Sequence, residues 1–128
     1  MDRWKEEIDM LRDEFPTLLH GANYDWIEIP DLQLPPGWNR EQTRLLVIIP
    51  PAYPETPPDN FYVGIGLKTA SGEAPGGFSE AVEKIGQSWG QFSWHVDVST
   101  WNPAPEVKDG HNLRTFISMA RARLSEIS

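Results

Sequence analysis

The sequence of 128 residues contains no cysteine, and this absence excludes disulfide bonds, thiolate metal sites and catalysis by a thiol. Basic residues are also few, because 11 lysines and arginines stand against 19 aspartates and glutamates, which gives a formal net charge of -8. Proteins that bind nucleic acid usually carry a basic surface that neutralises phosphates. The charge balance therefore predicts no nucleic-acid partner and favours partners with basic patches.

Long apolar runs are missing as well. No segment of the sequence approaches the ~20 consecutive apolar residues that span a bilayer. The N-terminal segment is acidic and helix-like and lacks the apolar region of a signal peptide. We therefore expect a cytoplasmic protein without a membrane partner. The length and a hydrophobic content of 39% predict one domain over residues 1–128 with a single core.

Two amphipathic segments predict helices near the two ends of the sequence. Apolar residues recur at helical spacing from Trp4 to Phe15, and Pro16 marks the end of this first helix. The last helix is expected to begin after Asn112, because asparagine is a preferred N-cap residue. Its buried face would consist of Leu113, Phe116, Ile117, Ala120 and Leu124.

Three strands are predicted between these helices. Residues 25–29 alternate in polarity and stop at Pro30, whereas residues 43–49 form an apolar, β-branched run that should be the most buried strand. Residues 60–67 predict a third strand, and the short connections favour an antiparallel meander.

Two connecting segments differ in composition. The first is rich in proline, which fixes φ and removes amide donors, so it predicts a rigid extended loop. We expect residues 53–58 of this loop to pack near Ser93. Its prolines are Pro50, Pro51, Pro54, Pro57 and Pro58. The second, residues 70–90, is rich in glycine and serine and predicts a long functional loop, with one or two helical turns at most in residues 78–85.

The segment 92–104 contains the candidate catalytic side chains. In an extended chain Ser93, His95 and Asp97 lie on one face. Such side chains point in parallel, about 6.6 Å apart along the strand, so the spacing alone does not imply a triad. We predict Ser93 as the nucleophile, His95 as its first candidate base with Asp97 beside it, and His111 as a second candidate base.

Two large aromatic residues are expected to be structural. Trp101 should pack in the core. Tyr53 should bury its ring and pair its hydroxyl with the backbone, as buried tyrosines commonly do.

Three motifs stand in the order found in ubiquitin-conjugating enzymes. Tyr53-Pro54, followed by Pro57-Pro58, resembles their proline-rich turn after an apolar strand. Trp101-Asn102-Pro103-Ala104 resembles their Trp-Ser-Pro-Ala segment before a helix, and their catalytic cysteine, eight residues before that tryptophan, corresponds to Ser93. The resemblance covers about residues 1–124 and is strongest to the prokaryotic ubiquitin-conjugating-like family E of bacterial ubiquitin-like operons.

This resemblance implies an α+β fold with an N-terminal helix, an antiparallel meander, a long active-site loop and a C-terminal helix packed on the sheet. It also implies a carrier that accepts the C-terminus of a ubiquitin-like protein from an activating enzyme, as an oxyester on Ser93, and passes it to a target amine. No metal or organic cofactor is implied, because the activating enzyme uses the ATP. The acidic first helix, including Glu6, Glu7 and Asp13, would dock on the activating enzyme.

The sequence departs from the family at three points. The nucleophile is serine instead of cysteine, the asparagine of a His-Pro-Asn motif would fall on Ile85, and only one helix follows the active-site segment. A serine hydroxyl requires activation by a base before it attacks a carbonyl. The role of His95 therefore matters more than it would beside a thiolate.

Other interpretations of the same residues stay open. Ser93 can be an ordinary loop serine, and the chain a non-catalytic conjugating-enzyme variant or an RWD-like protein-binding scaffold. It can also be a thioester enzyme in which serine has replaced the cysteine. An independent serine hydrolase is disfavoured, because the sequence contains no Gly-x-Ser-x-Gly motif.

Overall fold

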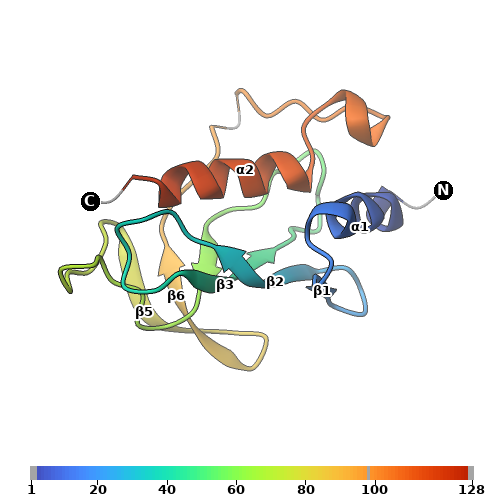
Figure 1. Cartoon of the computed structure of the whole chain (residues 1–128). Coiled ribbons are helices and arrows are strands. Elements are labelled where there is room, and N and C mark those ends of the chain that lie inside the picture. Colours follow the sequence, from blue (N-terminus) through green and yellow to red (C-terminus); the bar gives the residue numbers. More distant parts are fainter. Residues whose placement is uncertain (1–2, 98, 127–128) are drawn as a thin grey trace.

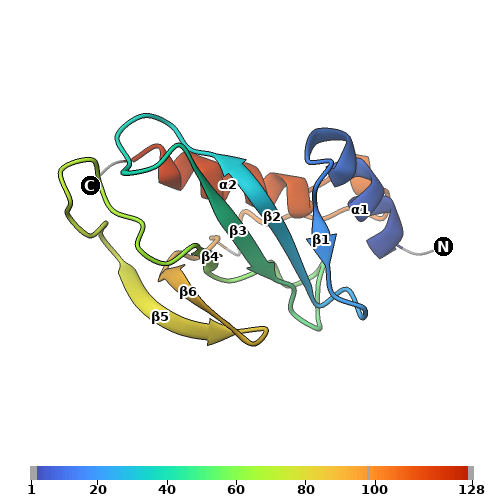
Figure 2. The same cartoon turned by 60° about the horizontal axis from the view of Figure 1, so that its bottom comes forward.

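The computed structural model describes residues 3–97 and 99–126. They form two α-helices above one face of an antiparallel sheet (Figure 1), and a short 3₁₀ helix, η1 (Val107–Asp109), precedes the second of them. The sheet has six strands in the order β1-β2-β3-β4-β6-β5. The predicted α+β fold is therefore confirmed. In the described part of the chain the opposite face of the sheet carries no helix (Figure 2). No helix among these residues is long and apolar enough to cross a membrane.

Both predicted helices form. Helix α1 spans Arg3–Glu14, and α2 spans Leu113–Leu124. Asn112 caps α2, because its side chain accepts the backbone N–H of Thr115 while the Thr115 hydroxyl accepts the N–H of Asn112. All five residues predicted for the inner face of α2 are buried.

The central meander is confirmed, but its third strand covers only Phe61–Val63 instead of residues 60–67, and its first strand is longer than expected. It consists of β2 (Trp26–Gln33), β3 (Gln42–Ile48) and β4 (Phe61–Val63), and β1 (Leu19–His20) extends it at one edge. The expectation that Pro30 ends the first of these strands is wrong. The pairing register shifts between Ile29 and Leu32, so the missing amide of Pro30 falls in a bulge and the strand continues.

The expected long loop at residues 70–90 is also wrong over most of its length. The strands β5 (Phe78–Lys84) and β6 (Gln87–Phe92) form an antiparallel hairpin there. Ile85 and Gly86 connect them with φ values of 46° and 74°, the backbone sign that two-residue hairpin turns require. The turn lets the two strands pair, so residues 78–85 form a strand and the start of the turn instead of the helical turns considered above.

The two faces of the sheet carry separate hydrophobic clusters. The larger lies under the helices, and within β3 it includes Leu45 and Val47. The smaller lies on the opposite face and is centred on Leu46, Tyr62 and Trp89. The curved β5-β6 hairpin supplies Trp89, whose ring centroid lies 3.9 Å from the guanidinium carbon of Arg44. The hairpin thus leads directly into Ser93 and also supplies Trp89 to the cluster on the helix-free face.

Candidate functional site

The proline-rich loop packs against the segment 92–104, as the sequence predicted. The N–H of Asn60 donates to the Trp94 carbonyl at 2.9 Å, and the N–H of Trp94 donates to Asn60 Oδ1 at 3.2 Å. Trp101 Nε1 donates to the Pro54 carbonyl at 2.7 Å. Trp101 is only 7% exposed, which confirms it as a core residue. Three hydrogen bonds from two parts of the segment therefore hold it against the loop.

A buried carboxylate holds the other side of this loop. Glu7 is 0% exposed, and its side chain accepts the Tyr53 hydroxyl at 2.9 Å, Arg3 Nε at 2.8 Å and the backbone N–H of Leu113 at 2.8 Å. Two expectations are corrected here. Tyr53 pairs its hydroxyl with a carboxylate rather than with the backbone, and Glu7 is absent from the exposed acidic surface of α1.

The electrostatics of this buried cluster favour a neutral tyrosine. Burial, and then the negative charge of Glu7, raise the pKa of Tyr53 far above its usual range. Arg3 opposes this shift, and its Nη1 also donates to the Ala104 carbonyl at 2.9 Å. The cluster links α1, the proline-rich loop, the start of α2 and the segment before it, so its role is structural.

Ser93 follows the last residue of β6 directly and is exposed. His95 and Asp97 are exposed too, whereas Val96 between them is buried. The N–H of Ser93 donates to the Gly77 carbonyl at 2.8 Å, and the N–H of Trp94 is already bonded to Asn60. When Ser93 attacks a carbonyl, the carbonyl oxygen becomes an oxyanion. That oxyanion would therefore need a donor other than these two amides.

The predicted site residues form hydrogen bonds with residues outside the proposed catalytic group. Within residues 3–97 and 99–126, no hydrogen bond joins the Ser93 hydroxyl to His95, Asp97 or His111. His95 Nδ1 pairs with Asp59 Oδ1 on the proline-rich loop. Asp97 Oδ1 instead accepts the Ser99 hydroxyl at 2.6 Å and the Ser99 N–H at 3.0 Å, and these bonds lower the pKa of Asp97.

His111 is built into the turn that precedes α2. Its Nδ1 accepts the N–H of Asn102 at 2.9 Å, and its own N–H donates to the Asn102 carbonyl at 3.0 Å. Its ring lies 5.3 Å from the Trp101 ring. These contacts bring His111 to the tryptophan motif, whereas His95 lies two residues from Ser93.

A hollow of about 230 Å³ borders the His95–Asp59 pair, and it is lined by Thr56, Pro57, Pro58, Asp59, His95 and Val96. Sequence reasoning did not identify Asp59. The available signal was its position directly after Pro57-Pro58, in a loop expected to pack beside Ser93. Nothing in the local pattern related Asp59 to His95, which lies 36 positions further along.

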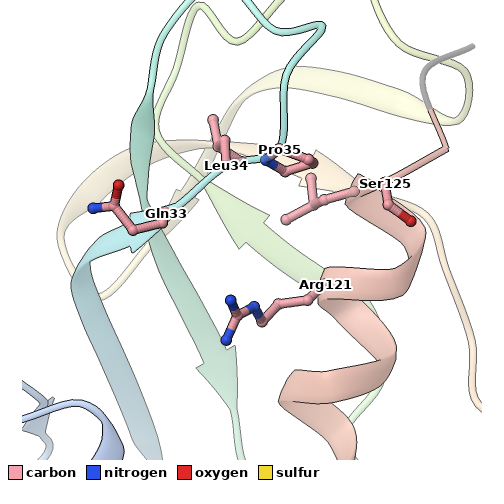
Figure 3. A pocket seen from close by; sticks show the side chains of 6 residues that line it. Gln33, Leu34, Pro35, Arg121 and Ser125 are labelled. Carbon is pink, nitrogen blue, oxygen red and sulfur yellow. The ribbon is translucent and has the colours of Figure 1, made fainter.

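A second hollow, of about 290 Å³, lies beside the C-terminal end of α2 (Figure 3). The Arg121 side chain extends from α2 across its opening, and Leu34 and Pro35 line the other side. Arg121 Nη1 lies 3.5 Å from Glu14 Oε2. None of the residues that line this hollow belongs to segment 92–104, so we do not include it in the candidate site. Among the described residues, no group of three histidine, aspartate or glutamate side chains could hold a metal ion.

One of three comparisons with known proteins gave a match. The family model described as prokaryotic E2 family E matches residues 3–125. No curated protein and no solved structure matches the chain. The matched range contains both helices, all six strands and every candidate site residue described above.

Proposed function

The chain belongs to prokaryotic E2 family E, and from this membership we propose that it carries a ubiquitin-like protein from an activating enzyme to a target amine. Membership suggests ubiquitin-like conjugation and implies an activating enzyme and a ubiquitin-like protein as partners. The identity of the linkage is a finer proposal, because the chain contains no cysteine. We assign the linkage to Ser93.

The observation that supports Ser93 most directly is its position. It is an exposed hydroxyl at the end of β6, eight residues before the buried Trp101, and an exposed imidazole lies two residues after it. In the loading step Ser93 Oγ attacks the activated C-terminal carbonyl of the ubiquitin-like protein. The C–O bond of the ester forms, the bond from that carbonyl to the activating group breaks, and the serine proton passes to His95.

The discharge step uses the same groups in reverse. A target amine attacks the ester carbonyl, the amide bond forms and the bond to Ser93 Oγ breaks. His95 takes the proton that the attacking amine loses and gives it to the departing Ser93 oxygen. An alkoxide is a poorer leaving group than a thiolate, so this protonation matters more for an oxyester than for a thioester.

We assign the encounter with the activating enzyme to the exposed face of α1. Glu7 is excluded from this face by its burial, but Asp9 and Asp13 are exposed on it. Negative charges on a docking face steer a partner that carries a basic groove, and added salt weakens such steering. The charge reversal Asp9→Lys with Asp13→Lys should slow loading at low salt, whereas an unchanged rate would remove this docking assignment.

The deciding experiment is an adduct assay with the activating enzyme, the ubiquitin-like protein and ATP. An oxyester on Ser93 should survive reducing agent and break in alkali or hydroxylamine. Ser93→Ala should abolish the adduct, and Ser93→Cys should give one that reducing agent releases. Normal conjugation by Ser93→Ala would exclude this mechanism.

A non-catalytic scaffold is the second candidate function. It is favoured by one observation, namely that the Ser93 hydroxyl has no hydrogen bond to a base within the described residues. In that case Ser93→Ala would leave the biological activity intact. Variants of the proline-rich loop and of the helix faces would impair it.

A further inference from the structure

We infer that Asp59 is a positioning residue that fixes the tautomer and orientation of His95. The expected effect on the rates of ester formation and discharge rests on the proposed function. The effect of Asp59 on the His95 tautomer does not depend on any reaction. The pairing of His95 Nδ1 with Asp59 Oδ1 carries the inference. Asp97, which lies two residues after His95 in the sequence, forms hydrogen bonds with Ser99 instead.

The backbone on both sides of this pair is held in place. Asp59 stands between buried Pro58 and Asn60, which exchanges two hydrogen bonds with Trp94. His95 stands between that same Trp94 and buried Val96. Exposed ion pairs usually contribute little, partly because two flexible side chains must be ordered. Here the Asn60–Trp94 connection orders both backbones in advance, so the pair forms at a smaller entropic cost.

The chemistry of the two side chains determines the tautomer. An ionised carboxylate can only accept hydrogen bonds, so His95 Nδ1 must carry the proton that it shares with Asp59. In the neutral imidazole the lone pair then lies on Nε2. Nε2 is the atom that can take the Ser93 proton during loading and return a proton to Ser93 Oγ during discharge. Asp59 thereby stabilises the imidazolium formed in between without itself becoming protonated.

His111 provides an internal reference with the opposite tautomer. Its Nδ1 accepts a backbone N–H from Asn102, so the proton of neutral His111 must lie on Nε2. His95 and His111 should therefore give opposite nitrogen signatures in one sample. This contrast does not depend on a partner protein.

The first test is long-range ¹H–¹⁵N correlation NMR on the full chain at about pH 8.5, where an ordinary histidine is neutral. Three imidazoles are assigned with His20→Gln, His95→Gln and His111→Gln. We expect protonated Nδ1 in His95 and protonated Nε2 in His111. Asp59→Asn should shift His95 away from its single tautomer and leave His111 unchanged, while the control Asp97→Asn should alter neither. Protonated Nε2 in wild-type His95, or no change in Asp59→Asn, overturns the inference.

The second test measures formation and discharge of the Ser93 ester. Asp59→Asn should slow both steps about 10-fold or more, a part of the 10²- to 10⁴-fold that a general base contributes, and Asp59→Glu should restore part of the rate. The control Asp31→Asn, at an exposed carboxylate on β2 away from segment 92–104, should react at the wild-type rate. Equal rates for wild type and Asp59→Asn would overturn the role of Asp59 in the reaction and leave the proposed function standing. If wild type forms no ester at all, the proposed function fails, and the tautomer measurement still decides whether Asp59 positions His95.

Discussion

Two carboxylates hold the proline-rich loop, and their surroundings give them different roles. Glu7 is wholly buried and has a charged partner, a hydroxyl and a backbone amide around it, whereas the Asp59 side chain is 65% exposed and pairs with one equally exposed imidazole. Removing a buried charge leaves its partners without compensation inside the protein, whereas water replaces a lost partner at the surface. The comparison therefore separates a carboxylate that supports folding from one that can support chemistry.

The strongest test of this contrast is Glu7→Ala. It removes the acceptor for Arg3, Tyr53 and the first amide of α2, so we expect a loss of about 3 to 5 kcal/mol in the free energy of unfolding. Urea denaturation measures the loss, and the matched control is Asp9→Ala, at an exposed carboxylate two residues later on α1, which should stay within about 0.5 kcal/mol of wild type. Similar midpoints for the two variants would place Glu7 with the exposed carboxylates.

Trp101→Ala extends the test to the other anchor of the loop. The variant removes a buried ring and the hydrogen bond to the Pro54 carbonyl. We expect a loss of about 3 kcal/mol, at the lower end of the range for large aromatic residues. Trp101→Phe should recover part of it, because the ring volume returns without the N–H donor. An unchanged melting temperature for Trp101→Ala would mean that the ring contributes nothing to packing.

Tyr53 makes the buried side of the comparison sensitive to alkali. Its pKa is raised in the native state, so native Tyr53 stays neutral while the unfolded residue ionises near its ordinary pKa of about 10. The stabilisation of the native state by neutral Tyr53 is therefore fully present below about pH 10 and is lost as the pH rises above that value. Tyr53→Phe should cost about 1.5 to 3 kcal/mol at pH 8, because it removes a hydrogen bond to a charged group.

The diagnostic feature of Tyr53→Phe is a smaller decline in stability between pH 8 and pH 10.5 than in wild type. Tyr24→Phe is the matched control, because Tyr24 is outside the Glu7 cluster and stacks on His20. If Tyr53→Phe and wild type decline in parallel, ionisation of Tyr53 is not linked to unfolding.

The smallest stability change is expected for Asp59→Asn. The pair with His95 is exposed, so the free energy of unfolding should change by no more than about 0.5 kcal/mol. The same variant should nevertheless alter the His95 tautomer and slow ester formation. A stability loss as large as that of Glu7→Ala would show that the two carboxylates play the same structural part.

The sequence predicted what local pattern determines. The period of apolar residues identified both helices, and the β-branched run identified β3 as a buried strand. The hairpin was missed because β5 is an exposed edge strand with polar residues on most positions, so it shows no clear alternation. Its turn also places Ile85 at a positive φ, which β-branched residues rarely adopt.

Local sequence pattern also limited the prediction of the candidate site, because contacts between distant residues leave no local signal. The position of the proline-rich loop beside Ser93 was predicted, but apart from Arg3 the partners of the two carboxylates lie far away in sequence. Glu7 contacts residues 46 and 106 positions further on, and the charged residues around it on α1 gave no sign that its side chain points inward. Asp59 and His95 meet only because β4 and β6 are neighbours in the sheet.

The irregular geometry of β5 has a consequence for how molecules of this chain meet one another. As the edge strand of the sheet, β5 could in principle pair with a strand of another molecule and begin aggregation. The register shift between Ser79 and Val82, with Ala81 at a φ of 61°, interrupts the straight row of amides and carbonyls that such pairing needs. The charges of Glu80, Glu83 and Lys84 add repulsion and hydration along the same edge. The edge strand β5 therefore keeps the sheet from growing between molecules.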